Sequence, residues 1–152
     1  MQERRIAVRG IIFKDGKLLS QKLTAYRRDN RDFWCTPGGG LDMGEQLEEG
    51  LRRELIEETG IDPKVGRLLF VQQFSEDGKK EQMEFFFLVE NPEDYGTIDL
   101  AATTHGELEI EQVEFIDPKN EVVLPAFLQT VDLERLTSTV QPVQIYNETA
   151  PL

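Results

Sequence analysis

The sequence predicts a single α/β domain in which a mixed β-sheet is packed between helices. A length of 152 residues suits one domain with a sizeable core. The composition, 39% hydrophobic and 30% charged, is typical of a soluble globular protein. Along the chain, runs of branched residues alternate with helical patterns, in the order strands, loop, helix, strands, long loop, strand, helix. We expect residues 1–136 to form this domain and residues 137–152 to form a C-terminal tail.

The first two strands are predicted at residues 5–13 and 17–23. Both runs are rich in branched side chains, and Asp15-Gly16 between them is a typical hairpin turn. Arg9 interrupts the first apolar run. It is either an edge arginine facing solvent or a residue at a point where the sheet opens to a cleft, and we include it among the candidate substrate-binding residues.

Residues 24–32 lack periodicity and are predicted to be a loop. Arg27, Arg28 and Arg31 make this segment basic in an otherwise acidic chain. A guanidinium fork matches phosphate oxygens, so Arg27 and Arg31 are candidate substrate-binding residues. The alternative is a loop whose arginines only keep the surface soluble. The next residues are Trp34, expected to be a packing anchor, and Cys35, the single cysteine, expected to be a small core residue.

A glycine-rich loop follows at 37–44 and leads into a helix with many glutamates. At about 100° per residue, one side of this helix carries an apolar stripe of Leu47, Leu51 and Leu55. Glu54 and Glu58 fall inside or beside that stripe, and Glu57 lies just off its edge. Glutamates on a helix usually form only a solvated face. Three carboxylates within about one turn, two of them on the buried side, are better explained by a hard divalent cation among them.

The glycines of the loop allow main-chain groups to approach a ligand closely. Gly38, Gly39, Gly40 and Gly44 are the residues concerned, and Gly39 is a candidate for substrate binding. Glycine-rich turns before helices also favour phosphate oxygens. An ordinary tight turn before a helix is the alternative.

At this point the residues resemble a known family. Gly39, then Glu45 after five residues, then Arg53-Glu54-Leu55-Ile56-Glu57-Glu58-Thr59-Gly60-Ile61 after seven, match every fixed position of the Nudix box. The chain therefore resembles Nudix hydrolases, which cleave a nucleoside diphosphate linked to another group and use magnesium or manganese. The resemblance implies an α/β/α sandwich and a small nucleotide-type substrate.

The resemblance also implies roles for individual residues. The carbonyl of Gly38 and the side chains of Glu54 and Glu58 would bind Mg²⁺ (or Mn²⁺), with Glu57 ligating directly or through water. Glu45 and Arg53 would orient the helix and its carboxylates.

Gly60 is well placed to end the helix, and a hairpin is predicted after it. Its strands would run over 64–75 and 82–90, joined by a turn at 76–80. Three consecutive phenylalanines, 85–87, favour a strand that is buried on both faces.

The segment 91–107 has no clear periodicity and is predicted to be a long loop of the kind that binds ligands. Glu107, Glu109 and Glu111 alternate ahead of a strand at 113–116, which would put all three on one strand face. The family pattern favours Glu109 as a further metal ligand, with Glu107 next. His105, the single histidine, could act as a general base, although a lone histidine in a polar loop is more often exposed and idle.

The last helix is predicted to begin at Leu124-Pro125, with an apolar stripe that packs on the sheet. The stripe consists of Leu124, Phe127, Leu128 and Val131, with Leu136 as a continuation. In the tail, Gln144-Ile145-Tyr146 would add an edge strand or mediate a subunit contact, as in a homodimer.

The formal net charge of −12 argues against a broad grip on nucleic acid or on an anionic membrane. We find no signal peptide, and no apolar run approaches the roughly 20 residues of a membrane span, so we expect a cytoplasmic enzyme.

We predict metal-assisted hydrolysis of a phosphoanhydride bond, with Glu54, or a glutamate in 107–111, as the proton acceptor. Nucleoside triphosphates, nucleotide sugars and dinucleotides all remain open as substrates. A catalytically silent nucleotide sensor and a prenyl-diphosphate isomerase are the alternatives. An isomerase would need a reactive cysteine, and only the position of Cys35 supports that reading.

Overall fold

A computed structural model describes residues 3–75 and 78–148 of the chain. The predicted turn at 76–80 and the predicted tail at 137–152 therefore lie partly outside the described residues. The strands are β1 (Glu3–Ile11), β2 (Phe13–Lys14), β3 (Lys17–Leu23), β4 (Gly38–Gly40), β5 (Val65–Ser75), β6 (Lys80–Val89), β7 (Ile110–Ile116) and β8 (Gln144–Glu148). The α-helices are α1 (Thr24–Arg28), α2 (Leu47–Thr59), α3 (Gly106–Glu109) and α4 (Leu133–Ser138), and short 3₁₀ turns are η1 (Pro92–Tyr95), η2 (Leu100–Ala102) and η3 (Ala126–Gln129).

The fold is the predicted mixed α/β arrangement, but its described strands form two sheets instead of one. The larger sheet has the order β4-β1-β6-β5-β8, and the smaller has the order β2-β3-β7. Within the larger sheet, β6 runs parallel to β1 and antiparallel to β5, while β8 lies parallel to β5 at the edge. The central place of β6 explains its apolar run, since Phe86 and Phe87 are buried on opposite faces.

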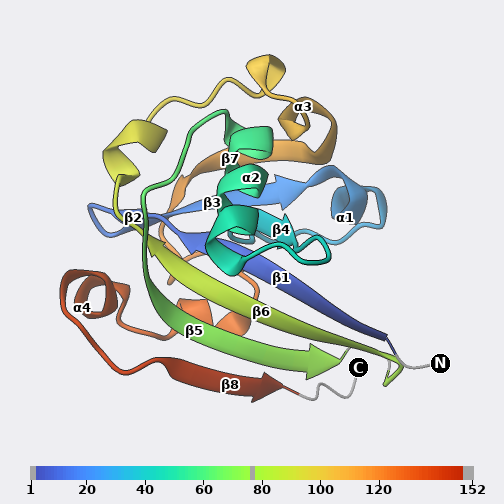
Figure 1. The fold of residues 1–152 in the computed structure, drawn as a ribbon. Coiled ribbons are helices and arrows are strands. Elements are labelled where there is room, and N and C mark those ends of the chain that lie inside the picture. Colours follow the sequence, from blue (N-terminus) through green and yellow to red (C-terminus); the bar gives the residue numbers. More distant parts are fainter. Residues whose placement is uncertain (1–2, 76–77, 149–152) are drawn as a thin grey trace.

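Helix α2 lies over the place where the two sheets meet (Figure 1). Leu51 and Leu55, which the helical period assigned to the core face, are fully buried against Val8, Leu19 and neighbouring side chains of both sheets. Gly60 ends the helix in the left-handed conformation, with φ of 77°. Burial of this stripe orients α2, so its remaining side chains have fixed directions.

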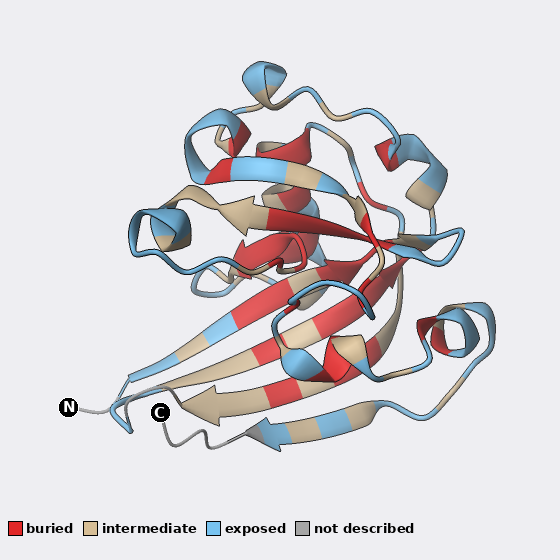
Figure 2. Ribbon diagram, turned by 180° about the vertical axis from the view of Figure 1, so that it is seen from behind, coloured by how far each residue is buried: buried red, intermediate tan, exposed pale blue. Residues whose placement is uncertain are grey.

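A second apolar cluster fills the other side of the larger sheet. Phe70 and Phe86 from the sheet pack there with Phe127 and Leu128 of η3 and with Leu136 of α4. Figure 2 shows that buried residues concentrate where the sheets approach each other, whereas the strand ends are more exposed. The two clusters hold α2 on one side of the larger sheet and the C-terminal segment on the other.

Three local expectations were wrong. Residues 24–28 form the short helix α1, although they were expected to belong to a loop. The apolar stripe beginning at Leu124 does not form one helix, because η3 ends at Gln129 and α4 begins only at Leu133. Asp132 starts α4 separately by accepting a hydrogen bond from the Arg135 amide, 3.1 Å away.

The third correction concerns the glutamates near residue 109. Glu107 and Glu109 lie in α3, and only Glu111 lies in β7, so the three carboxylates do not share a strand face. The segment 91–107 is also less irregular than expected, since it contains η1 and η2. A four-residue helical turn has a different period from a strand, and it turns Glu107 and Glu109 in different directions.

The packing of α2 yields a stability prediction. Leu55→Ala should lower the free energy of unfolding by about 3 kcal/mol, because Leu55 is 0% exposed and packs against Gly10 in the sheet. The neighbouring Ile56 is 42% exposed, so Ile56→Ala should cost less than about 1 kcal/mol. Urea unfolding of both variants measures the difference, and equal losses would contradict the described packing of α2.

Candidate active site

Strand β4 brings the glycine-rich segment against helix α2. It pairs antiparallel with β1, so that Gly39 lies opposite Val8 and Gly38 opposite Arg9. A Cβ atom at Gly39 would lie 2.6 Å from the Glu54 carboxyl carbon, and at Gly38 φ is +139° with the Val8 carbonyl in the way. Only glycine allows such a close approach of backbone to a carboxylate. The segment 37–44 was expected to be a loop, but Gly38–Gly40 form strand β4.

Arg53 joins this segment to the carboxylates. Its Nε donates to Glu45 Oε2 at 2.7 Å and its Nη2 to Glu45 Oε1 at 2.9 Å, while Nη2 also reaches the Gly40 carbonyl at 3.1 Å. Hydrogen bonds from Arg53, together with the Asp42 amide, lower the pKa of Glu45 to about 2. The structure thus brings Glu45 and Arg53 together as a bidentate ion pair.

The other end of the guanidinium contacts two more glutamates of α2. Arg53 Nη1 lies 3.0 Å from Glu54 Oε1 and 3.4 Å from Glu57 Oε2. His105 Nδ1 lies 3.2 Å from the same Glu57 oxygen, and the His105 amide donates to the Glu57 carbonyl at 3.0 Å. Burial raises the pKa of Glu54, against the opposing effect of Arg53. His105 thus contacts Glu57 but lines neither of the two cavities described below.

Glu58 is the most deeply buried of these carboxyls. Only 4% of the residue is exposed, and the Gly38 amide donates to its Oε2 at 3.3 Å. Desolvation by burial raises the pKa of Glu58 to about 8, although Arg9 acts in the opposite direction. A positive charge close to this carboxyl group would stabilise its ionised form.

Arg9 lies in the interior of the larger sheet and not at a solvent-facing edge. Its Nε donates to Glu84 Oε2 at 2.9 Å, and its Nη1 donates to the Gly38 carbonyl at 3.1 Å. Burial opposes the charged form, but Glu84 and other neighbours outweigh it, and the pKa of Arg9 is raised. Arg9 thus contacts the same carbonyl that was predicted to bind a metal ion.

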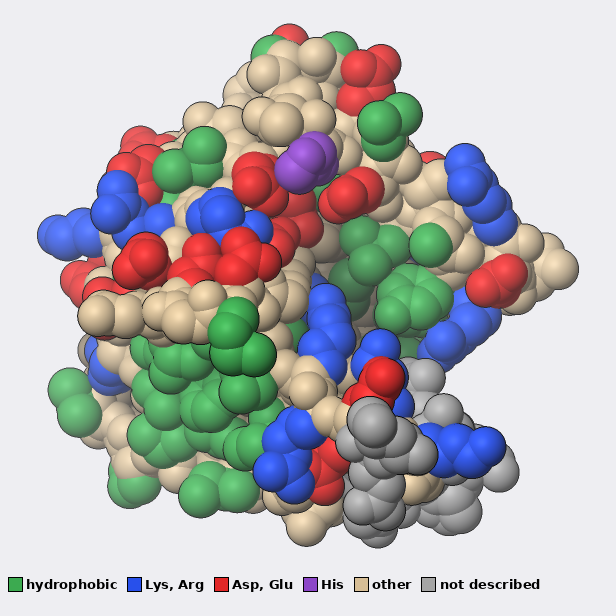
Figure 3. Space-filling model, turned by 45° about the vertical axis from the view of Figure 1, so that its right-hand side comes forward, with side chains coloured by type: hydrophobic (Ala, Val, Ile, Leu, Met, Phe, Trp, Pro, Cys, Tyr) green, Lys and Arg blue, Asp and Glu red, His purple; other side chains and the backbone are tan. Residues whose placement is uncertain are grey.

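A cavity of about 460 Å³ lies over this cluster. Its lining contains several of the predicted site residues: Arg9, Gly38, Gly39, Glu54, Glu58 and Glu109. Arg5, Arg28 and the α1 residues Thr24–Tyr26 complete it, together with Leu23, Gly40 and Leu108. Figure 3 shows carboxylates gathered beside the histidine above a hollow in which Lys and Arg side chains also lie. We refer to the cavity lined by these residues as the first cavity.

A second cavity, of about 610 Å³, adjoins the first and shares Arg5, Arg9, Leu23 and Tyr26 with it. Arg31 lines this second cavity. Arg27 lines neither, because its guanidinium pairs with Asp32 at 3.1 Å and with Glu111 at 3.2 Å. The basic segment is therefore divided between a cavity wall and a surface ion-pair network.

Sequence reasoning overlooked several lining residues, including Arg5, Tyr26 and Gln72. Arg5 alternates with Arg9 along β1, so the period of the strand places both on one face and could have identified it. Gln72 carries no comparable signal, because a single glutamine in a strand is ordinary. Cys35 is not suited to nucleophilic chemistry, since burial raises the pKa of its thiol to about 11.

The donor set suits a divalent cation, although the carboxylates are engaged elsewhere. Within residues 3–75 and 78–148, no three His, Cys, Asp or Glu side chains are arranged to hold one ion. Arg53 contacts Glu54 through Oε1 and Glu57 through Oε2, so the other oxygen of each carboxylate would be the one to bind a cation. Carboxylate and carbonyl oxygens are the ligands that Mg²⁺ and Mn²⁺ prefer, and a cation would favour the ionised form of buried Glu58. The residues present therefore fit such an ion.

A family model, curated relatives and solved structures match this chain. A family model described as the NUDIX domain matches residues 3–135. An ADP-ribose pyrophosphatase from Methanocaldococcus jannaschii is 46% identical over 69 residues, which are 43% of this chain and 38% of that protein. Nucleoside triphosphatase NudI from Escherichia coli is 34% identical over 101 residues, 59% of this chain and 67% of the relative. The chain therefore spans about two fifths of the first relative's length.

A crystal structure of a MutT protein from Methanosarcina mazei has the same fold. Its TM-score is 0.64 at 23% identity, and the match covers 84% of this chain and 89% of that one. Among the described residues, no helix is long and apolar enough to cross a membrane.

Burial of Glu58 predicts a pH-dependent stability in the presence of a chelator. Its pKa is about 8 in the folded chain, against an ordinary value of 4.5, so the unfolded chain releases this proton first as the pH rises. The folded state therefore loses stability between pH 4.5 and about 8. Glu58→Gln removes this loss, and its melting temperature should gain on that of the wild type as the pH rises.

Circular dichroism melts from pH 5 to 9, with a chelator present throughout, measure the effect. Glu49→Gln is the control, because Glu49 is an exposed glutamate of the same helix. A constant difference between Glu58→Gln and the wild type across this range would contradict the raised pKa.

Proposed function

The chain belongs to the NUDIX domain family, and on this premise we propose that it hydrolyses a phosphoanhydride bond in a nucleoside diphosphate linked to another group. The observation that carries this proposal is the first cavity, where the backbone of Gly38–Gly40, Glu54 and Glu58 meet the positive charge of Arg9. Hydrolysis of a diphosphate needs positive charge that neutralises the phosphate oxygens and a carboxylate that accepts a proton from the attacking water, close together in one cavity. The adjoining second cavity offers room for the remainder of the substrate.

We assign the metal ligands as the sequence predicted them. The Gly38 carbonyl, Glu54, Glu57 and Glu58 would hold Mg²⁺ or Mn²⁺, with Glu109 of α3, which also lines the first cavity, as a further ligand. When bound, the ion would neutralise charge on the diphosphate and lower the pKa of the attacking water.

The chain's own residues have separate tasks in this proposal. Arg53 of α2 bonds both to Glu45 and to the Gly40 carbonyl of β4. This guanidinium therefore fixes the position of α2 relative to the glycine strand. Glu54 accepts the proton of the attacking water, since its carboxylate lines the first cavity beside the Gly39 backbone. The Gly39 backbone, Arg9 and Arg31 contact the substrate. Arg27, the remaining candidate, would first have to leave Asp32 and Glu111.

The substrate is a small nucleotide-type molecule in this proposal. The relatives named as an ADP-ribose pyrophosphatase and as a nucleoside triphosphatase support a nucleotide linked to a sugar or to further phosphates. A net charge of −12 disfavours nucleic acid and anionic membranes as partners. Cytoplasmic location and a homodimer stay predictions from the sequence.

The alternatives are weaker on physical grounds. A prenyl-diphosphate isomerase would need a reactive thiol, whereas the pKa of Cys35 is raised and its Sγ lies 3.5 Å from the Gln21 carbonyl as a donor. A silent nucleotide sensor has no need for a crowded, partly desolvated carboxylate cluster.

A phosphate-release screen tests the proposal. Nucleoside triphosphates, nucleotide sugars and dinucleotides are each incubated with the chain and Mg²⁺ or Mn²⁺, with and without excess chelator. We expect turnover of one class that the chelator abolishes. Tight nucleotide binding without turnover of any class would overturn the proposal in favour of the sensor.

Glu54→Gln tests the role of one carboxylate. Loss of the proton acceptor should lower kcat by about 100-fold or more, because general base catalysis contributes on this scale. Glu49→Gln, on the outward side of the same helix, should keep wild-type kcat. Melting curves of both variants establish that α2 remains folded. Near-normal turnover of Glu54→Gln would remove Glu54 from the mechanism.

A further inference from the structure

His105 joins the end of helix α2 to the start of helix α3. Its amide donates to the Glu57 carbonyl at 3.0 Å, and its carbonyl accepts from the Glu109 amide at 3.1 Å. The Glu57 carbonyl belongs to the last turn of α2, where carbonyl groups have no partner within the helix. The backbone of His105 therefore caps one carbonyl of α2 and also precedes the first residue of α3.

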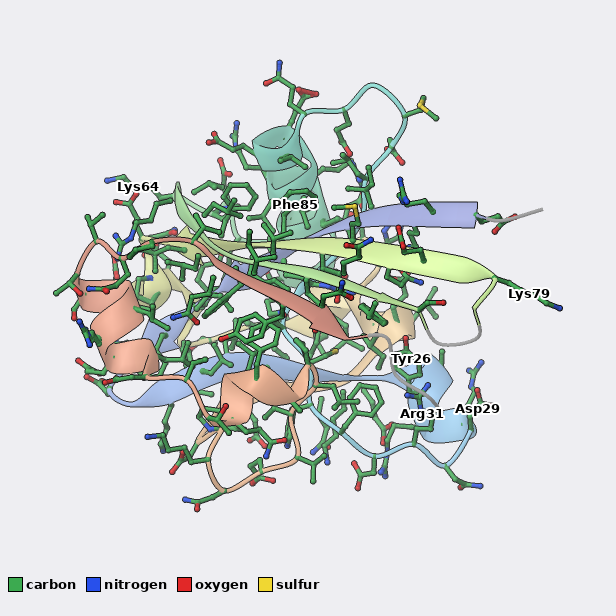
Figure 4. All side chains as sticks on the ribbon, turned by 90° about the horizontal axis from the view of Figure 1, so that it is seen from below. Tyr26, Asp29, Arg31, Lys64, Lys79 and Phe85 are labelled. Carbon is green, nitrogen blue, oxygen red and sulfur yellow. The ribbon has the colours of Figure 1, made fainter. Side chains whose placement is uncertain are left out.

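The segment around His105 packs tightly against α2. A Cβ atom at Gly106 would collide with the Glu58 carbonyl oxygen, so this close approach requires a glycine. The Gly106 amide donates to Thr103 Oγ1 at 2.9 Å, which fixes the turn before α3. Helix α3 also lies close to α1, where Figure 4 shows Tyr26. Tyr26 of α1 and Glu109 of α3 both line the first cavity, so His105 is anchored at the edge of that cavity.

The side chain of His105 contacts the same glutamate as its backbone. Its Nδ1 lies 3.2 Å from Glu57 Oε2, and Arg53 Nη1 lies 3.4 Å from this oxygen. Figure 3 shows the single histidine among carboxylate side chains above the hollow. An ionised carboxylate only accepts hydrogen bonds, so Nδ1 of His105 carries the proton. Oε2 of Glu57 thus has two donors, and Oε1 is the oxygen that a cation would bind.

The backbone contact makes the side-chain contact easier to form. Because the His105 amide already bonds to Glu57, the imidazole starts beside the carboxylate. Little further conformational entropy is lost when the two side chains meet. The carboxylate of Glu57 is therefore held in one orientation by Arg53 and His105 together.

We propose that His105 is a positioning residue for the metal site of the proposed function, on which this inference rests. Its imidazole holds Glu57 Oε2, so that Oε1 stays directed to Mg²⁺ or Mn²⁺. Partners that orient a ligating carboxylate in this way commonly set the metal affinity of a site. His105 lines neither cavity, so it acts through Glu57 and not as the general base.

Binding of Mn²⁺ to the full chain without substrate, measured by titration calorimetry, tests the inference apart from turnover. His105→Ala should weaken Mn²⁺ binding about tenfold or more, because loss of such a partner costs about 10- to 100-fold in affinity. His105→Asn should stay within about threefold of the wild type, since its amide nitrogen occupies the position of Nδ1 along the side chain and also donates. Wild-type Mn²⁺ affinity in His105→Ala would overturn the proposal.

Two further variants define the route of the effect. Thr104→Ala is the matched control, because Thr104 is the exposed neighbour of His105, and it should bind Mn²⁺ like the wild type. Glu57→Gln removes the ionised ligand, so adding His105→Ala to it should cost less than about threefold more in affinity. A full tenfold loss in that background would show that His105 does not act through Glu57.

A spectroscopic signature separates positioning from a general loss of structure. His105 is the only histidine, so its ring gives one set of ¹⁵N NMR signals. In the metal-free chain at about pH 9, where an imidazole is neutral, the proton should reside on Nδ1, which faces Glu57. In Glu57→Ala it should move to Nε2, as in a free histidine side chain. A proton on Nε2 in the wild type would contradict the contact.

The same measurements separate this inference from the proposed function. Turnover and Mn²⁺ binding that are indifferent to His105 would leave metal-assisted hydrolysis standing and remove His105 from it. A wild-type chain that binds no Mn²⁺ would instead overturn the metal assignment, and the role of His105 would fall with it.

Discussion

The candidate site depends on one guanidinium. Arg53 bonds to Glu45 before the helix, to the Gly40 carbonyl in β4 and to Glu54 and Glu57 within α2, so a single side chain ties three segments together. An arginine can do this because its planar fork donates in several directions and stays charged. Lysine, with one compact charge, could not reproduce the same set of bonds. The spacing of Glu45 and Arg53 in the box is therefore a geometric requirement.

Around this ion pair, the fold places carboxyl groups where hydration is poor. Burial raises the pKa of Glu58 to about 8 and also raises that of Glu54. Such an arrangement opposes the stability of the folded chain, and it becomes favourable when positive charge enters the first cavity. The amide of Gly38 and the guanidinium of Arg9 supply only part of that charge. Local destabilisation and proposed ligand binding are thus two consequences of the same burial.

In the proposed function, the first cavity binds the phosphates and the second cavity offers room for the remainder of the substrate. The first is lined by β1, the segment 23–28, the glycine strand, α2 and α3. The second is assembled from α1, the larger sheet and the segment before η3. Arg9 lies between them, with one nitrogen directed to Gly38 and another to Glu84. A change in the second cavity could therefore alter which substrate binds and leave the first cavity intact.

The sequence by itself determined the fold class and the amphipathic face of α2, because the periods of helices and strands are local properties. The family resemblance came from the fixed spacing of Gly39, Glu45 and Arg53–Ile61. Only the tertiary structure decided that Gly38–Gly40 form a strand on β1, that Glu109 reaches the first cavity from α3, and that Glu107 and Glu111 diverge from it. The same holds for Gln72, whose partner Glu84 lies on a different strand. Pairing between strands distant in sequence sets these positions, and no local pattern encodes that pairing.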